Sequence, residues 1–253
     1  MQITKYNASG NDFIIYHDKE SRDRSALAKL LCDRQKGVGA DGMVVLIPHV
    51  KYDFEWDFYN CDGSQAAMCG NATRAVAHYA VEQGISLNNR AEFLTRAGLI
   101  CAEVNGVYIV TDMPKPKILR RDINAYGCTW WLIDSGVPHL LCQKDNVEEF
   151  DLAQAKELRE EYDANVNIYS VGDNGMKVRT YERGVEDETL ACGTGIMACY
   201  VRALEENSVS ENSTSIMARS GEELYMELDE NDTYRFGGKV TKTFVAETES
   251  IQP

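Results

Sequence analysis

The strongest constraint in the sequence is an internal repeat centred on two cysteines. In the first copy, residues 58–64 read FYNCDGS and residues 68–72 read MCGNA. In the second copy, residues 180–184 read TYERG and residues 191–195 read ACGTG. Tyr59 precedes Cys69 by ten residues, and Tyr181 precedes Cys192 by eleven. Each copy predicts a strand, a polar loop, a Cys-Gly turn and a helix, so we expect two similar halves. Chance similarity of two short Cys-Gly turns is the alternative.

Periodicity predicts the elements around this repeat. Helical patterns cover residues 24–33, 71–83, 151–162 and 194–206, and Gly84 stands where a C-cap glycine would end the second. Strand patterns cover residues 12–16, 43–47, 54–59, 107–110 and 177–181. We place a boundary near Met113, which gives an N-terminal half, 1–113, with Cys69 and a C-terminal half, 114–253, with Cys192. The last strand is allowed to cross back to the first half.

Composition narrows the class of protein. The chain has 253 residues, 44% of them apolar, a mean hydropathy of -0.37 and a formal charge of -14. These values indicate a folded, soluble chain whose surface repels nucleic acid and anionic membranes. No apolar run is long enough to span a bilayer, and the first residues do not resemble a signal peptide. We therefore expect a cytoplasmic protein with neither nucleic acid nor membrane as a partner.

The remaining cysteines and the histidines suggest no metal site. The eight cysteines include no C-x-x-C pair, and the four histidines have no H-x-x-x-H spacing. In a chain of this length without a secretory signal, we expect reduced thiols. Six cysteines lack the turn context of Cys69 and Cys192 and are interpreted as packing residues. They are Cys32, Cys61, Cys101, Cys128, Cys142 and Cys199.

The position of Cys69 and Cys192 predicts acid and base chemistry. Backbone N–H groups at a helix start carry partial positive charge, which favours a thiolate and can hold a carboxylate. Inverting an amino-acid α carbon needs one group to remove a proton and another to deliver one on the opposite face. Two thiols at two helix starts meet this need, because the helix termini also stabilise the enolate-like carboxylate. The scheme requires no cofactor, and no motif specifies pyridoxal phosphate. The alternative is that both thiols are merely buried.

At these residues the sequence resembles the diaminopimelate epimerase family. The resemblance runs through most of the chain and is carried by residues 9–13, 37–41, 62–71, 181–184 and 192–195. It implies an α/β (α+β) fold of two similar domains, each a curled, mainly antiparallel sheet around a central helix, related by pseudo-twofold symmetry. It also implies a cofactor-independent isomerase that interconverts LL- and meso-diaminopimelate for lysine and peptidoglycan synthesis, with a homodimer as a further expectation.

The resemblance assigns roles to individual residues. Cys69 and Cys192 match the catalytic cysteines. Backbone groups of Gly70, Asn71, Gly193 and Thr194 match the cradle for the reacting carboxylate. Polar substrate contacts are matched by Asn11, Asn60, Asn165, Glu182 and Arg183. His139, together with Glu182, matches residues that tune the cysteines, although a lone histidine can also be purely structural. Arg183 can bind a distal carboxylate bidentately, or it can be a surface arginine paired with Glu186 or Glu188.

The chain departs from the family pattern at three positions. Members commonly have asparagine where this chain has Val137, often glutamine at Gly42, and often tyrosine where it has Phe244 at a dimer contact.

Three alternative functions stay open at this point. A racemase of another amino acid would turn over a different member of an amino-acid panel. A thiol redox protein would cycle a Cys69–Cys192 disulfide with a reductant. A non-catalytic binding module would tolerate alanine at both cysteines.

Overall fold

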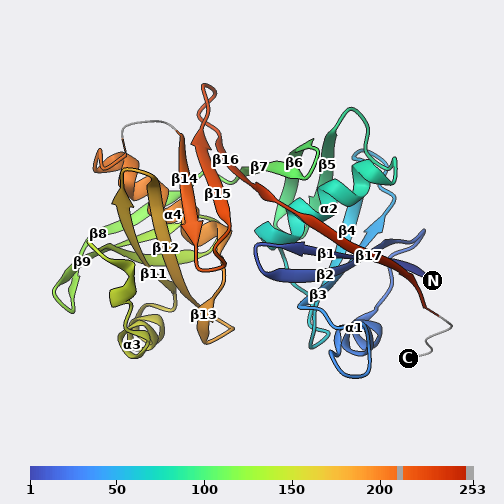
Figure 1. Ribbon diagram of the computed structural model, residues 1–253, viewed down its shortest axis with the longest axis horizontal. Helices are drawn as coiled ribbons and strands as arrows, with labels where there is room; N and C mark the ends of the chain where they lie inside the picture. Colours follow the sequence, from blue (N-terminus) through green and yellow to red (C-terminus); the bar gives the residue numbers. More distant parts are fainter. Residues whose placement is uncertain (210–212, 249–253) are drawn as a thin grey trace. The chain divides into compact units, whose positions relative to one another are not determined.

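The computed structural model describes residues 1–209 and 213–248. By its internal contacts the chain divides into two compact units (Figure 1). The first unit comprises Met1–Thr111 and Gly238–Pro253, and the second comprises Asp112–Gly237. The chain thus leaves the first unit once and returns to it at its C-terminal end. Each unit combines strands with a few helices, which is an α+β architecture.

The first unit is a mainly antiparallel sheet with two helices. Its elements are β1 (Gln2–Ala8), β2 (Asn11–His17), α1 (Ser25–Cys32), β3 (Gly42–Ile47), β4 (Phe54–Asn60), α2 (Gly70–Glu82), β5 (Arg90–Thr95), β6 (Gly98–Asn105), β7 (Tyr108–Met113) and β17 (Thr241–Glu247). The order β17-β1-β2-β3-β4-β5-β6-β7 follows from the pairings, and only β2–β3 and β4–β5 are parallel.

The second unit repeats this arrangement. Its elements are β8 (Lys117–Ala125), β9 (Cys128–Asp134), β10 (Pro138–Gln143), the short 3₁₀ helix η1 (Val147–Glu149), α3 (Leu152–Tyr162), β11 (Asn165–Gly172), β12 (Gly175–Glu182), β13 (Asp187–Thr189), α4 (Gly193–Glu205), β14 (Ser213–Ala218), β15 (Glu223–Leu228) and β16 (Tyr234–Lys239). Here too only two pairings are parallel, β10–β11 and β12–β14.

The two units therefore share one sequence of elements. Each has a hairpin, a helix and a parallel return strand, followed by an antiparallel strand, a long helix and a final three-strand meander. The C-terminal strand β17 pairs with β1 in the first unit as β8 pairs with β9 in the second. The repeat in the sequence thus reflects a repeat in topology, and the expected fold class is confirmed.

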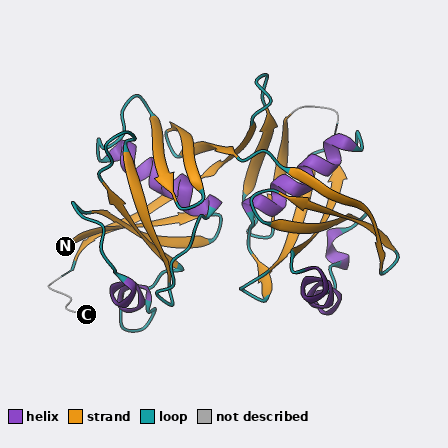
Figure 2. Ribbon diagram, turned by 180° about the vertical axis from the view of Figure 1, so that it is seen from behind, coloured by secondary structure: helices purple, strands orange, loops and turns teal. Residues whose placement is uncertain are grey.

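The long helix of each unit packs into the apolar face of its own sheet. Helix α2 buries Ala72, Ala75, Val76 and Ala80 among side chains of β2, β4, β5 and β6. Helix α4 buries Ile196 to Ala203 in the corresponding cluster of the second unit, with only Arg202 in that run being charged. Figure 2 shows both helices lying against the strands of their own units. Small residues dominate α2, which lets the surrounding strands approach it closely.

The expected helices are confirmed to within one residue at each end. Gly84 has φ +70°, as a C-cap glycine requires, and its N–H donates to the carbonyl of Val81. The five expected strands correspond to β2, β3, β4, β7 and β12, although Val107 precedes β7. Within the described residues, twelve further strands had no prediction. Among them, β8 is largely polar and exposed, and β5 and β15 mix charged and apolar residues.

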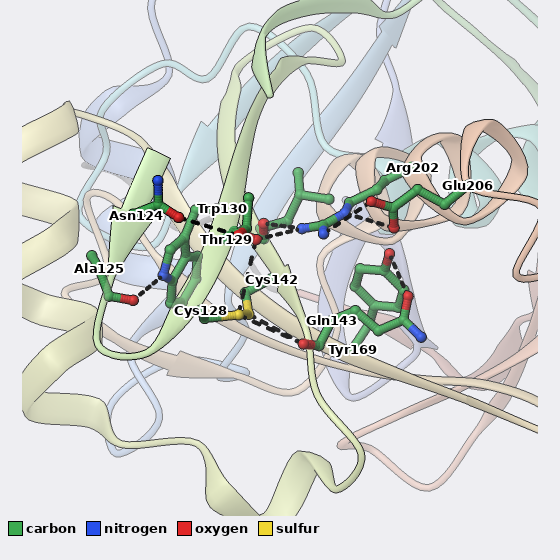
Figure 3. The surroundings of a disulfide bond; sticks show 11 residues. Asn124, Ala125, Cys128, Thr129, Trp130, Cys142, Gln143, Tyr169, Arg202 and Glu206 are labelled. Atoms are coloured by element: carbon green, nitrogen blue, oxygen red, sulfur yellow. Dashed lines mark hydrogen bonds and ion pairs between the residues drawn. A yellow bond between two sulfur atoms is a disulfide. The ribbon is translucent and has the colours of Figure 1, made fainter. Parts of the chain in front are cut away.

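Two expectations about cysteines are wrong. Cys128 and Cys142, expected as separate reduced packing residues, form a disulfide between the neighbouring strands β9 and β10 (Figure 3), with Cα atoms 6.5 Å apart. The physical reason is strand pairing, which brings together two residues that lie 14 apart in sequence. Cys61 is exposed and is not a packing residue, since it lies in the turn after β4. Cys32 and Cys199 are buried as expected, and Cys101 is partly buried.

Candidate active site

Both repeat cysteines are the N-cap residues of the long helices. Cys69 precedes α2 and Cys192 precedes α4, each with an extended backbone, φ -147° and φ -122° respectively. Their carbonyls accept the first helical hydrogen bonds, from Thr73 and Ile196, both at 2.9 Å. The N–H groups of the three residues after each cysteine consequently have no acceptor within the helix. Because both cysteines are N-caps, their side chains lie beside positively polarised helix starts, and both are partly buried.

The polar loop before each cysteine folds back on its strand in the same way. In the first unit Tyr59 forms an antiparallel bridge with Gln65. In the second unit Tyr181 pairs with Glu188 of β13. The repeated tyrosine therefore marks the start of a small hairpin in both units. This hairpin brings the chain to the helix start, which explains why the tyrosine-to-cysteine spacing is nearly constant.

A chain of oriented amides lies behind Cys69. The fully buried guanidinium of Arg74 donates to Oδ1 of Asn71 at 2.8 Å and to Ser9 Oγ at 2.7 Å. Asn71 in turn donates from Nδ2 to Oδ1 of Asn11 at 2.7 Å. Asn11 donates from its own Nδ2 to the carboxylate of Asp41 at 3.1 Å. Each amide in the series has its oxygen and nitrogen assigned by the next partner, so Asn11 and Asn71 are held in one orientation.

A cluster of charges anchors this chain at its far end. Arg34 donates to the carboxylates of Asp12 and Asp41 at 2.9 and 2.8 Å, and Lys5 pairs with Asp12 at 2.8 Å. Burial alone would raise the pKa of Asp12, but the bonds from Arg34 and Lys5 lower it to about 2. Asn60, a further expected contact, lies in the first unit and donates to Ser64 Oγ at 2.9 Å.

His139 lies behind Cys192. It is fully buried, and its Nε2 is 2.9 Å from Oγ1 of Thr194, which is itself 3.5 Å from the sulfur of Cys192. Burial, together with the positive charge of Arg183, lowers the pKa of His139 to about 3. The ring is therefore neutral at physiological pH.

The other expected residues of the second unit lie at the edge of β11 and β12. Asn165 accepts a 2.8 Å hydrogen bond from the backbone N–H of Arg183. Burial raises the pKa of Glu182. The Arg183 side chain donates to the backbone carbonyl of Asp163 at 2.8 Å and to its carboxylate at 3.0 Å. Its partner is therefore neither of the glutamates expected for a surface arginine, since Glu186 pairs with Arg159 and Glu188 pairs with Arg179.

The three positions that are expected to depart from the family pattern have different structural settings. Val137 is exposed in the turn between β9 and β10. Gly42 is buried, and a β-carbon on it would meet the ring of Phe58 at 2.7 Å and the carbonyl of Tyr59 at 3.0 Å. A glutamine at Gly42 would thus require Phe58 to move. Phe244, the third, is 42% exposed on β17.

The sequence reading missed Arg74, Asn167 and Thr180. A second echo could have drawn attention to the surroundings of Asn11 and His139. Residues 9–11 read SGN and residues 135–137 read SGV, and both segments form the turn of the corresponding hairpin. The Arg74 signal was a lone charge inside the apolar stretch of a helix. Because exposed helix faces also carry arginines, this signal has meaning only once burial is known.

Comparison with known proteins identifies the family of this chain. The family model for diaminopimelate epimerase matches residues 3–119 and 131–242. This chain belongs to the diaminopimelate epimerase family. A diaminopimelate epimerase from Nitratiruptor sp. is 52% identical over 252 residues, which cover 99% of this chain and 100% of the relative.

Solved structures extend the likeness of this diaminopimelate epimerase family member at the level of fold. A phenazine biosynthesis protein of the PhzF family from Enterococcus faecalis has a TM-score of 0.79 at 15% identity and covers 98% of each chain. A probable proline racemase from Agrobacterium radiobacter has a TM-score of 0.75 at 13% identity, covering 99% of this chain and 93% of that one. At such identities these two structures support the fold alone.

The described residues of this family member contain neither a membrane-spanning helix nor a cluster of metal-ligating side chains. Among residues 1–209 and 213–248, no helix is both long enough and apolar enough to cross a membrane. Within the same residues, no group of three or more His, Cys, Asp or Glu side chains is arranged to hold a metal ion.

Proposed function

We propose that this protein interconverts LL- and meso-2,6-diaminopimelate without a cofactor, using Cys69 and Cys192 as the two acid–base groups. The observation that carries the proposal is that both cysteines are N-caps of long helices in matching contexts. One thiolate would remove the α proton while the other thiol donates a proton to the opposite face. Full-length identity of 52% to a diaminopimelate epimerase supports the choice of substrate.

The helix starts would bind the reacting carboxylate. Backbone N–H groups of Gly70, Asn71, Gly193 and Thr194 are the donors in this proposal. Their partial positive charge would stabilise the enolate-like intermediate that forms when the proton leaves. Because the proposed donors are backbone groups, they cost little reorganisation during the reaction.

The polar residues around the helix starts would recognise the rest of the substrate. In the first unit, Asn11 has its amide orientation set by Asn71 and Asp41, which supports a role in binding an ammonium or carboxylate group. Asn60 is a candidate on the same unit. In the second unit, the candidates are Asn165, Glu182 and Arg183. Arg183 is the candidate for an anionic end of the substrate, whose carboxylate would replace its exposed partner, the carboxylate of Asp163.

The proposal includes a cellular role. Diaminopimelate feeds lysine and peptidoglycan synthesis, so we propose a biosynthetic enzyme of the cytoplasm. We also propose a homodimer, for which the exposed Phe244 and Val245 on β17 offer an apolar contact.

A racemase of another amino acid is the alternative, which the 52% identity to a diaminopimelate epimerase over the full chain does not favour. Val137 provides no polar group in a turn where family members commonly have asparagine, and it is 36% exposed. A smaller or less polar distal end would suit valine better than an ammonium carboxylate would. A probable proline racemase has a similar fold.

A substrate panel separates the two candidates. The purified protein is incubated with LL-diaminopimelate, L-proline, L-lysine and L-glutamate, and the stereoisomers are resolved by chiral chromatography. We expect conversion of LL-diaminopimelate to the meso form and no racemisation of the others. Turnover of another amino acid with diaminopimelate unchanged would overturn the proposed substrate.

A further inference from the structure

The two units differ at three matched positions of their sheets, on the strands that surround α2 in the first unit and α4 in the second. Phe13 and His139 are equivalent, because each is paired with the first residue of the parallel return strand. Two residues into that strand, Val44 pairs with Phe58 in the first unit, and Asn167 pairs with Thr180 in the second. The first unit thus fills these sites with Phe13, Val44 and Phe58, all members of its apolar core.

The second unit has buried polar groups at the same sites. His139, Asn167 and Thr180 are each at most 3% exposed. Buried polar groups are costly unless every one of them is hydrogen-bonded. Since the first unit shows that an apolar set fits the same architecture, stability does not explain the polar set.

The start of α4 also differs from the start of α2 at the residue next to these polar side chains. Gly195 is the equivalent of Ala72, counted from the cysteines. A β-carbon on Gly195 would lie 2.4 Å from Oδ1 of Asn167 and 3.2 Å from Cε1 of His139. Glycine at this position therefore lets α4 approach the polar side chains directly.

Hydrogen bonding fixes the amide of Asn167. One of its two terminal atoms lies 3.2 Å from the carbonyl oxygen of Leu140, and a carbonyl can only accept. That atom must be Nδ2, and it also lies 3.0 Å from Nδ1 of His139. The other atom, Oδ1, accepts from the hydroxyl of Thr180 at 2.8 Å.

The orientation of Asn167 sets the tautomer of His139. Because Nδ1 accepts from Asn167, the proton of the neutral ring is on Nε2. Nε2–H then donates to Oγ1 of Thr194 at 2.9 Å. The amide nitrogen of Asn165 lies 3.4 Å from the same Nε2 and could donate to it in the other tautomer. That tautomer would place a proton on Nδ1, facing the donor Nδ2 of Asn167 at 3.0 Å. The shorter and better-fixed contact with Asn167 decides the tautomer.

We propose that Asn167 is a positioning residue that acts on Cys192 through His139 and Thr194. With Nε2–H directed at its oxygen, the hydroxyl of Thr194 turns its own proton toward the sulfur of Cys192, 3.5 Å away. That hydrogen bond favours the thiolate. The inference rests on the proposed function, in which Cys192 is an acid–base group. It also makes the two cysteines unequal, since Phe13 at the position of His139 cannot donate to the first helix start.

Two measurements test this proposal without diaminopimelate. In the first, the intact protein is labelled with ¹⁵N-histidine, and two-bond proton–nitrogen correlation spectra identify the tautomer of each ring, with His139 assigned by its loss in His139→Gln. We expect a neutral Nε2–H ring for His139. A neutral Nδ1–H ring for His139 in the unsubstituted protein would overturn the proposal.

The second measurement is the alkylation rate of Cys192. The rate with iodoacetamide at neutral pH is followed by peptide mass mapping in the unsubstituted protein, Asn167→Val and Thr180→Val. Asn167→Val introduces the residue of the first unit and should slow alkylation roughly three- to tenfold, the loss expected for one hydrogen bond to the thiolate. Thr180→Val disturbs the same buried group but leaves the bond from Asn167 to His139, so its rate should stay within about twofold.

Each alkylation result either supports or contradicts the positioning role of Asn167. An unchanged rate in folded Asn167→Val, or equal slowing in both variants, would contradict the positioning role. The slowing seen only in Asn167→Val, in a protein that does not epimerise diaminopimelate, would support this inference while rejecting the proposed substrate.

Discussion

Gly195 lies against Asn167 so closely that a single added methyl group would come within 2.4 Å of the amide oxygen. Its counterpart Ala72 packs its methyl group into the apolar core of the first unit. The difference between the two helix starts thus follows from what lies behind each of them.

Gly195→Ala should be costly for that reason. Overpacking of a close-packed site is expected to cost about 1–3 kcal/mol of unfolding free energy, and the displaced Asn167 and Thr194 should lower kcat/KM as well. Chemical denaturation and the epimerase assay measure the two effects. Ala72→Gly is the matched control, and its expected cost combines the helix propensity of glycine, about 1 kcal/mol, with the loss of a buried methyl group, about 0.8 kcal/mol. A loss below about 1 kcal/mol in Gly195→Ala would show that the close contact is relaxed at little cost.

The stability of the protein should fall in mildly acidic solution. The pKa of buried His139 is lowered to about 3, whereas an exposed histidine has a pKa of about 6.5. Between these values the unfolded chain binds a proton that the native ring does not, so stability is complete above about pH 6.5 and falls as the pH is lowered. The slope from this one group approaches about 1.4 kcal/mol per pH unit.

His139→Gln should remove that contribution to the slope. Denaturant unfolding of both proteins across the acidic range measures it, with His49→Gln as the control because His49 is only partly buried, in the loop between β3 and β4. Parallel stability curves for the unsubstituted protein and His139→Gln would contradict the buried, neutral ring.

Arg183 should determine how tightly the far end of the substrate binds. Removing a charge-assisted contact to a desolvated carboxylate is expected to cost on the order of 2–5 kcal/mol. At about 1.4 kcal/mol per tenfold, this is a drop in kcat/KM of roughly 30-fold to several thousand-fold in Arg183→Ala. Arg183→Lys should recover only part of the loss, because an ammonium lacks the planar fork.

The ion pair of Arg183 with Asp163 provides a control. The carboxylate of Asp163 is 74% exposed, so Asp163→Asn should change the stability by less than about 1 kcal/mol. Kinetics with LL-diaminopimelate on Arg183→Ala, Arg183→Lys and Asp163→Asn give the comparison. Near-native kcat/KM in the alanine variant would remove Arg183 from the site and would increase the weight of Val137 as evidence for a different amino acid.

The disulfide between Cys128 and Cys142 should stabilise the second unit. Closing a loop of this length is expected to contribute about 3 kcal/mol through the unfolded state. Unfolding of the oxidised protein and of a Cys128→Ser/Cys142→Ser variant measures this contribution. Cys61→Ser, at an exposed cysteine, is the control. Identical stability, or peptide mapping without a Cys128–Cys142 link after oxidation, would reject the bond.

Local patterns predicted the helices and the two cysteine turns well. Those features depend on neighbouring residues: apolar spacing along α2 and α4, Gly84 at a helix end, and a Cys-Gly pair before each helix. Strands such as β8 and β15 could not be predicted in this way, because their stability comes from partners that are distant in sequence. The exposed Arg120 of β8, for example, carries no signal of its pairing with Leu132 of β9.

Only those residues of the candidate site that lie in local sequence motifs were predictable. Cys69, Cys192 and the residues beside them are recognisable from motifs. The residues behind them are recognisable only from the fold, since Asn167 and Thr180 reach His139 through strand pairing and not through sequence proximity. The buried state of Arg74 likewise depends on Ser9, 65 residues away.

The central claim is that Cys69 and Cys192 are both required to invert one α carbon. The most direct test is proton NMR of LL-diaminopimelate in deuterated water with the unsubstituted protein, Cys69→Ala and Cys192→Ala, with folding of each variant checked by circular dichroism. We predict loss of one α-proton signal and formation of the meso isomer with the unsubstituted protein, and no meso isomer with either variant. Substantial epimerisation by either folded single-alanine variant would contradict the two-base account.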